Sequence, residues 1–215
     1  MKTILLQGVV GSTAYGLNRP DSDKDQIGVF VYDRGEYYGL NDPDESIVTK
    51  DPDLALHEAR KYCRLVLKCN PTVMELLWLE SYETITLAGA NLVGLRRYCL
   101  SEQAVREAYL GYAKSQLNRL HNRQGDLNEK RVAKHAMHMA RLTNQGMELY
   151  TTGQLTIKVA DPDWYVHFSK QSTDYWTKWY SKREAEFRSS KCILPERAQP
   201  NVFADWYYKV RMGQI

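Results

Sequence analysis

Two short apolar runs enclose a polar turn near the start of the chain, and this arrangement constrains the fold more than any other feature. Residues 3–10 (TILLQGVV) and 26–32 (QIGVFVY) predict two buried strands, because both are apolar and the second is rich in β-branched and aromatic residues. The segment between them contains Gly, Ser, Asn, Pro and Asp, which favour turns. We therefore expect a sheet in the first third of the chain.

The sequence between residues 33 and 79 predicts a third strand and then a change to helical periodicity. Residues 33–50 are polar and are expected to form a loop or a ragged hairpin, and residues 54–56 a strand. Apolar residues then recur at helical spacing from Glu58. Asn70-Pro71 ends that helix, and a second helix is expected over residues 72–79.

The rest of the chain is predicted to be mainly helical. Helices are expected at residues 102–123, 129–152 and near 172–188, residues 154–159 (QLTIKV) as a strand or extended segment, and the tail from Pro195 as irregular. The order of elements indicates an α+β fold, with a small sheet followed by a helical C-terminal lobe. We place the boundary between two lobes at 1–90 and 91–215.

Composition limits the class of protein without selecting a function. The chain is 43% hydrophobic and 26% charged with a net charge of +3, which is typical of a globular protein and compatible with a polyanionic partner. No long apolar span or signal-peptide layout is evident, so a cytoplasmic protein without a membrane partner is expected. The four cysteines form no CxxC pair and are expected to be reduced and mostly buried. The oligomeric state stays open.

The turn between the first two strands carries residues suited to phosphate chemistry. Asp23 and Asp25 are two residues apart at the entrance of a strand, so their carboxylates are expected on one face, where a divalent cation would relieve their repulsion. Gly11 allows a tight turn, and Ser12 and the turn N–H groups can bind a phosphate. Together these features suggest phosphoryl or nucleotidyl transfer. The alternative is that the aspartates are ordinary turn residues.

Residues 11–31 (GSTAYGLNRPDSDKDQIGVFV) resemble the signature of the DNA polymerase β-type nucleotidyltransferase superfamily, which has a GS turn, a spacer and an acidic pair on the next strand. Residues 56–78 (LHEARKYCRLVLKCNPTVMELLW) and 134–155 (KHAMHMARLTNQGMELYTTGQL) are similar to its RNA-repair-associated branch. The resemblance covers roughly residues 4–157. It implies that the lobe at 1–90 is catalytic, with a small mixed, polymerase β-like sheet.

The resemblance also implies roles for individual residues. Gly11 and Ser12 match the phosphate-binding turn, and Asp23 and Asp25 match the metal-binding, catalytic pair. A third carboxylate is expected on a neighbouring strand, and we predict Asp53. Two alternatives stay open: Glu58, which fits the start of a helix better, and His57, which could act as a base.

The helix at 129–152 carries a polar stripe. Lys134, His138, Arg141 and Gln145 share one side of it, and the resemblance to the family's Lys…His…Arg helix makes the first three candidate nucleotide-binding residues. The alternative is a solvated helix surface. Aromatic residues towards the C-terminus could stack on nucleic-acid bases, but core packing is favoured. They are Trp164, Tyr165, Trp176, Trp179, Tyr180, Trp206, Tyr207 and Tyr208.

The resemblance implies a metal-dependent nucleotidyltransferase. It would move an NMP from an NTP, ATP among the candidates, to an acceptor hydroxyl and release pyrophosphate by two-metal chemistry with Mg²⁺ or Mn²⁺. The acceptor is expected to be an RNA end, with tRNA among the candidates. The alternatives are a protein or small-molecule acceptor, and a catalytically silent NTP- or RNA-binding module, against which the intact Gly11, Ser12, Asp23 and Asp25 argue.

Overall fold

The structure is a computed structural model that describes residues 2–18, 23–38, 43–122 and 129–215. The chain divides into two compact units: Met1–Leu100 together with Ala198–Ile215, and Ser101–Arg197. The first unit contains the sheet and the second is helical. The predicted α+β class, with a mixed sheet followed by a helical region, is confirmed.

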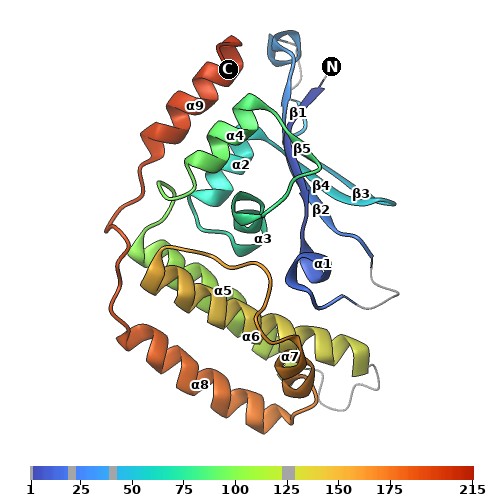
Figure 1. The fold of residues 1–215 in the computed structure, drawn as a ribbon, viewed down its shortest axis with the longest axis vertical. Helices are drawn as coiled ribbons and strands as arrows, with labels where there is room; N and C mark the ends of the chain where they lie inside the picture. Colours follow the sequence, from blue (N-terminus) through green and yellow to red (C-terminus); the bar gives the residue numbers. More distant parts are fainter. Residues whose placement is uncertain (1, 19–22, 39–42, 123–128) are drawn as a thin grey trace. The chain divides into compact units, whose positions relative to one another are not determined.

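Among the described residues, the first unit contains a five-stranded mixed sheet of order β3-β4-β2-β1-β5 (Figure 1). β1 pairs antiparallel with β2 and β5, β2 pairs parallel with β4, and β3 pairs antiparallel with β4. The predicted strands at residues 3–10, 26–32 and 54–56 are confirmed. The strand bounds are β1 Lys2–Val9, β2 Gln26–Tyr32, β3 Ser46–Lys50, β4 Asp53–Glu58 and β5 Thr84–Ile85.

The register of these strands brings three chain segments to one end of the sheet. Val9, the last residue of β1, pairs with Gln26, the first residue of β2. Gln26 also pairs with Leu54 near the start of β4. The end of β1 and the starts of β2 and β4 therefore lie side by side, and we call this the motif end of the sheet.

Short helices of the first unit cover the sheet on one side (Figure 1). α2 packs on β2 and β4, α4 on β1, and the 3₁₀ helix η2 also on β1. The helix expected at residues 72–79 is divided, because α3 ends at Met74 and continues as η2. The helices and 3₁₀ turns before residue 100 are α1 Gly11–Tyr15, η1 Arg34–Tyr38, α2 Ala59–Val66, α3 Pro71–Met74, η2 Glu75–Trp78 and α4 Leu87–Gly94.

The prediction of an irregular tail from Pro195 is wrong for its last part, because α9 (Pro200–Met212) returns to the first unit and packs on α2 and α4. Phe203, Trp206 and Val210 are buried at helical spacing, and Trp206 Nε1 donates to the carbonyl of Ala88 at 3.0 Å. Pro200 begins the helix and a left-handed glycine follows it.

The segment expected as a loop or hairpin between residues 33 and 50 contains more regular structure than a loop. η1 follows β2, and β3 forms a hairpin with β4. Residues 39–42 of that segment lie outside the described residues, as do residues 19–22 before β2 and residues 123–128 between the two long helices.

The second unit is built on two long helices, as predicted. α5 and α6 pack against each other at close range: a Cβ on Gly146 would lie 2.5 Å from Cβ of Tyr109. Residues 154–159 form an extended segment rather than a strand, with Leu155 and Ile157 buried. The helices of this unit are α5 Glu102–His121, α6 Glu129–Thr152, α7 Pro162–Phe168 and α8 Thr173–Ser189.

All four cysteines are free, with Cys63, Cys69 and Cys99 buried and Cys192 half-buried, which agrees with the prediction of reduced, mostly buried thiols. In the part of the chain that is described, no helix is both long and apolar enough to cross a membrane.

Candidate functional site

Gly11 and Asp25 lie in direct contact at the motif end of the sheet. Gly11 has a φ of +71°, and a Cβ at this position would overlap Asp25 Oδ2 and lie 3.0 Å from its Cγ. The backbone N–H of Val10 also donates to the carbonyl of Asp25 at 2.9 Å. Glycine is required here for two reasons: a left-handed backbone and the close approach of a carboxylate. The structure therefore brings the GS turn and the second predicted aspartate together.

Ser12 lies in the first turn of α1, which follows β1 without a loop (Figure 1). Its carbonyl accepts from the N–H of Leu17 at 2.9 Å, and Gly16 ends the helix in the left-handed conformation. Ser12 is half-buried, so its N–H and hydroxyl groups stand close to the surface at the motif end.

Asp23 is exposed and Asp25 is half-buried, just before β2. Between them, Lys24 Nζ lies 3.5 Å from Glu83 Oε1, so this side chain is directed towards the segment that precedes β5. The exposure of Asp23 leaves its carboxylate accessible to a ligand from solvent.

The two candidates for a third carboxylate lie at opposite ends of β4. Asp53 is exposed and immediately precedes Leu54, the partner of Gln26, just as Asp25 immediately precedes Gln26. Glu58 is five residues further along the strand, about 16 Å at the usual rise per residue. Asp53 is therefore at the motif end, and Glu58 is not.

Glu58 is already occupied in structural contacts. It is 3% exposed, it accepts from the backbone N–H of Arg60 at 2.7 Å, and the hydroxyl of Tyr37 donates to it at 2.6 Å. The first contact caps the N-terminus of α2, as the sequence suggested. This arrangement fits a helix cap that also fixes η1.

His57 also lies at the far end of β4. Its Nδ1 is 2.8 Å from Ser46 Oγ, on the neighbouring strand β3. Burial, together with the positive charge of Lys61, lowers the pKa of His57 below its usual value. The imidazole is thus neutral near pH 7. It lies near the far end of β4, however, and so away from Asp25 and the motif end.

The donor chemistry of Asp23 and Asp25 fits a hard divalent cation. Mg²⁺ typically takes one or two carboxylates and completes its shell with phosphate oxygens and water. Among the described residues, no group of three His, Cys, Asp or Glu is close enough together to hold a metal ion. Asp53 is therefore not gathered with the other two aspartates into one ligand set in this structure.

The polar stripe on α6 is divided between surface and interior. Lys134 is exposed, whereas Arg141 and Gln145 are 3% and 5% exposed, so the alternative of a solvated surface is wrong for those two. Arg141 Nη1 donates to Gln145 Oε1 at 2.6 Å, and Gln145 Nε2 donates to the carbonyl of Thr156 at 2.8 Å. Gln145 thereby fixes the extended segment after α6.

Positive charge surrounds His138 in the second unit. Burial and the charges of Arg141, His135, Lys134 and Arg119 lower its pKa to about 3. His138 is therefore neutral near pH 7 and offers one N–H donor rather than a charge. Arg119, on α5, was not predicted from the sequence, because its contribution depends on how α5 packs against α6.

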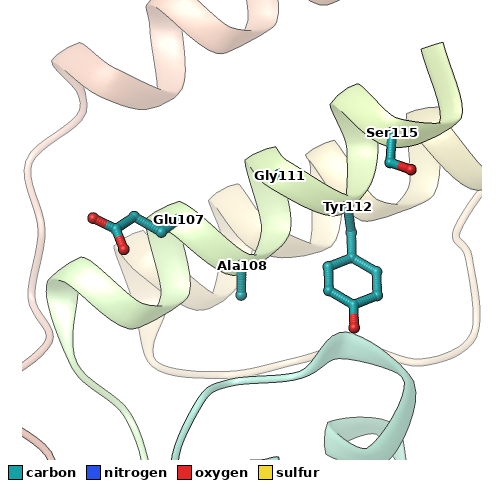
Figure 2. A pocket seen from close by; sticks show the side chains of 5 residues that line it. All are labelled: Glu107, Ala108, Gly111, Tyr112 and Ser115. Carbon is teal, nitrogen blue, oxygen red and sulfur yellow. The ribbon is translucent and has the colours of Figure 1, made fainter. Parts of the chain in front are cut away.

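A surface hollow on α5 and the aromatic residues of α7, α8 and α9 are two further features of the helical part of the chain. A surface hollow of about 370 Å³ lies along α5, lined by Glu107, Ala108, Gly111, Tyr112 and Ser115 (Figure 2). The expected packing role of the C-terminal aromatics is confirmed for Tyr165, Trp176, Tyr180 and Trp206, which are buried, whereas Tyr208 is 57% exposed.

Comparison with known proteins identifies the class. The chain matches RlaP, described as RNA repair pathway DNA polymerase beta family, over residues 2–174. This match covers most of the chain, so the protein belongs to that family. Membership implies a polymerase β-like nucleotidyltransferase in RNA repair. A search of curated proteins gave no match.

Proposed function

We propose that the protein is a metal-dependent nucleotidyltransferase that moves an NMP from an NTP to a hydroxyl at an RNA end. The contact between Gly11 and Asp25 carries the proposal, since it unites the GS turn and the acidic pair at one end of the sheet. An oxygen–phosphorus bond forms between the acceptor hydroxyl and the α-phosphorus, the bond to the β-phosphate bridging oxygen breaks, and pyrophosphate leaves.

At the motif end, one set of residues is proposed to bind the triphosphate and another to bind the metal. Backbone N–H groups of the Gly11–Ser12 turn and the Ser12 hydroxyl bind the triphosphate. Asp23 and Asp25 would hold divalent cations, Mg²⁺ or Mn²⁺, which would neutralise phosphate charge and favour deprotonation of the acceptor hydroxyl. Gly11 keeps the turn close enough to Asp25 for both groups to reach one nucleotide.

Asp53 is proposed as the third carboxylate. It is exposed at the start of β4, beside the start of β2, whereas Glu58 is buried and engaged by Tyr37 and Arg60. The Asp53 carboxylate would accept the proton from the attacking hydroxyl.

On α6, Lys134, His138 and Arg141 are proposed as nucleotide-binding residues. The positive charges around His138 favour an anionic ligand, and neutral His138 can donate one hydrogen bond. Buried Arg141 also has a structural contact with Gln145, so its replacement is expected to lower stability as well as nucleotide use.

A labelling assay tests the proposed function. Each α-labelled NTP is incubated with the protein, Mg²⁺ or Mn²⁺, and a pool of tRNA and oligoribonucleotides. We expect label in RNA with the wild type and none with Asp23→Asn or Asp25→Asn. Asp53→Asn should lower the rate at least a hundredfold, whereas Asp51→Asn, which removes an exposed carboxylate two residues away, should not.

The other outcomes distinguish the alternatives. Label in protein alone would replace the RNA acceptor with a protein acceptor. Nucleotide binding without transfer to any acceptor would indicate the silent module. A rate that falls with Glu58→Gln and not with Asp53→Asn, in variants of equal stability, would reverse the choice of third carboxylate.

A further inference from the structure

Tyr15 and Glu75 join α1 to the interior of the first unit. The Tyr15 hydroxyl lies 2.7 Å from Oε1 and 2.6 Å from Oε2 of Glu75, to which it donates. Glu75 is 3% exposed and begins η2, whose next residues Leu76 and Leu77 are completely buried. A residue of α1 is thus hydrogen-bonded to a carboxyl group in the core, sixty positions away in the sequence.

α1 needs such a contact, because it has little support of its own. It contains five residues, none of them buried, and Val10 provides no side-chain cap. Helices this short are unstable in isolation and depend on tertiary contacts. The orientation of the Gly11–Ser12 turn at one end of α1 therefore depends on what holds Tyr15 at the other.

The element that carries Glu75 is fixed to the strand from which α1 emerges. η2 packs on β1, and a Cβ on Gly8 would lie 3.5 Å from Cδ1 of Leu76 and still closer to Leu79. β1 leads within three residues from Gly8 to Gly11. β1 leads into α1, Tyr15 of α1 is bonded to Glu75 of η2, and η2 packs back on β1. We call this closed set of contacts, which holds the GS turn, the brace.

We propose that Tyr15 and Glu75 are positioning residues for nucleotide binding, and that their hydrogen bond holds the Gly11–Ser12 turn in the geometry that accepts a triphosphate. This inference rests on the proposed function, because it assigns the turn a nucleotide. Neither side chain needs to touch the nucleotide, since both act through the backbone of α1.

Equilibrium binding of each NTP with Mg²⁺ tests the proposal in four variants. Tyr15→Phe removes the donor and Glu75→Leu the acceptor, and each should weaken binding about tenfold, as expected for one hydrogen bond to a carboxyl group. Glu75→Gln keeps an acceptor oxygen and should stay within about threefold of the wild type. The double variant Tyr15→Phe/Glu75→Leu should bind the NTP no more weakly than the weaker-binding of its two single variants.

Tyr82→Phe is the matched control. It also removes one tyrosine hydroxyl from the first unit, but that hydroxyl is buried and has no hydrogen-bond partner among the described groups. Binding should be unchanged. An equal loss in Tyr82→Phe, or in Glu75→Gln and Glu75→Leu alike, would overturn the proposal, because the effect would not follow the Tyr15–Glu75 bond.

Hydrogen exchange without nucleotide separates this inference from the proposed function. Amides of residues 11–17 should exchange faster in Tyr15→Phe than in the wild type, while those of β2 and β4 keep their rates. Unchanged exchange at residues 11–17 would overturn the brace. A wild type that binds no NTP would instead overturn the proposed function and the nucleotide role, whatever the exchange data show.

Discussion

At the residue scale, Gly11 links the backbone conformation of the GS turn directly to the position of the Asp25 carboxylate. Gly11→Ala places a Cβ at a φ of +71° and against the Asp25 carboxylate. The left-handed backbone alone costs roughly 1–2 kcal/mol. We expect a loss of at least that size in the free energy of unfolding, measured by urea denaturation, and loss of nucleotide transfer.

Gly111→Ala is the control for that substitution. Gly111 lies inside α5, and apart from its own helix backbone no atom of the described residues lies within 4 Å of its potential Cβ. Alanine should raise the free energy of unfolding by about 0.5–1 kcal/mol, since glycine is a poor helix former. If Gly11→Ala were as stable and active as the wild type, the contact with Asp25 would not constrain the turn.

His138 makes the second unit sensitive to acid. Its pKa is lowered to about 3 in the folded chain, against about 6.5 for an unfolded histidine. Between these values the unfolded chain binds a proton that the folded chain does not, so stability falls as the pH drops below about 6.5.

His138→Gln should therefore reduce the loss of stability between pH 7 and pH 5 by about 1–2 kcal/mol. Denaturant unfolding at both pH values measures it, with His167→Gln, at an exposed position, as the control. An identical pH dependence in the wild type and His138→Gln would show that folding does not lower the pKa of His138.

At the scale of single elements, α9 was not predicted from the sequence, yet it packs on α2 and α4 through buried residues. Phe203 is 1% exposed, so Phe203→Ala should cost about 3–5 kcal/mol of the free energy of unfolding. Tyr208→Ala, at an exposed position of the same helix, should change it by no more than about 0.5 kcal/mol. Equal effects in a denaturant series would mean that α9 does not pack on α2 and α4.

Sequence periodicity predicted those helices and strands that have a clear hydrophobic pattern within their own residues. β2 and α6 were predicted with their bounds, because one has a continuous β-branched run and the other a long apolar stripe between clear end signals. α9 has a stripe of only three buried residues among charged and aromatic neighbours, so its pattern is weak over thirteen residues. β5 has two residues and exists only through pairing with β1.

The candidate site was predictable to the extent that it is local. Gly11, Ser12, Asp23 and Asp25 lie in one segment with a readable spacing. The placement of Asp53 beside Asp25 required the parallel pairing of β2 and β4, and the contact of Tyr15 with Glu75 required the packing of η2 on β1. No local signal in the sequence specifies pairings between such distant segments.

At the scale of the whole molecule, the first unit is discontinuous in sequence. The chain leaves it after Leu100, forms the second unit, and returns at Ala198 to add α9. Arg211 links α9 to η1 and β2 of the first unit. Its guanidinium lies 3.5 Å from the centre of the Tyr37 ring and donates to the carbonyl of Tyr32 at 2.8 Å. Arg34 donates in return to the carbonyls of Arg211 and Met212.

A chain that ends at Arg197 should therefore destabilise the first unit and spare the second. Removing α9 exposes the apolar surfaces of α2 and α4 that Phe203, Trp206 and Val210 cover. Hydrogen exchange should become faster in β1, β2, β4 and α2, while α5 and α6 keep their protection, because their contacts with α7 and α8 lie within residues 101–197.

A chain that ends at Gly213 keeps α9 and is the control for this truncation. It should exchange like the full chain throughout residues 2–100. If the chain ending at Arg197 kept full protection there, the sheet and its own helices would be a self-sufficient unit. If α5 and α6 lost protection together with the sheet, the two units would unfold as one. The expected pattern, loss confined to the first unit, would also make nucleotide binding at the motif end dependent on the last helix of the chain.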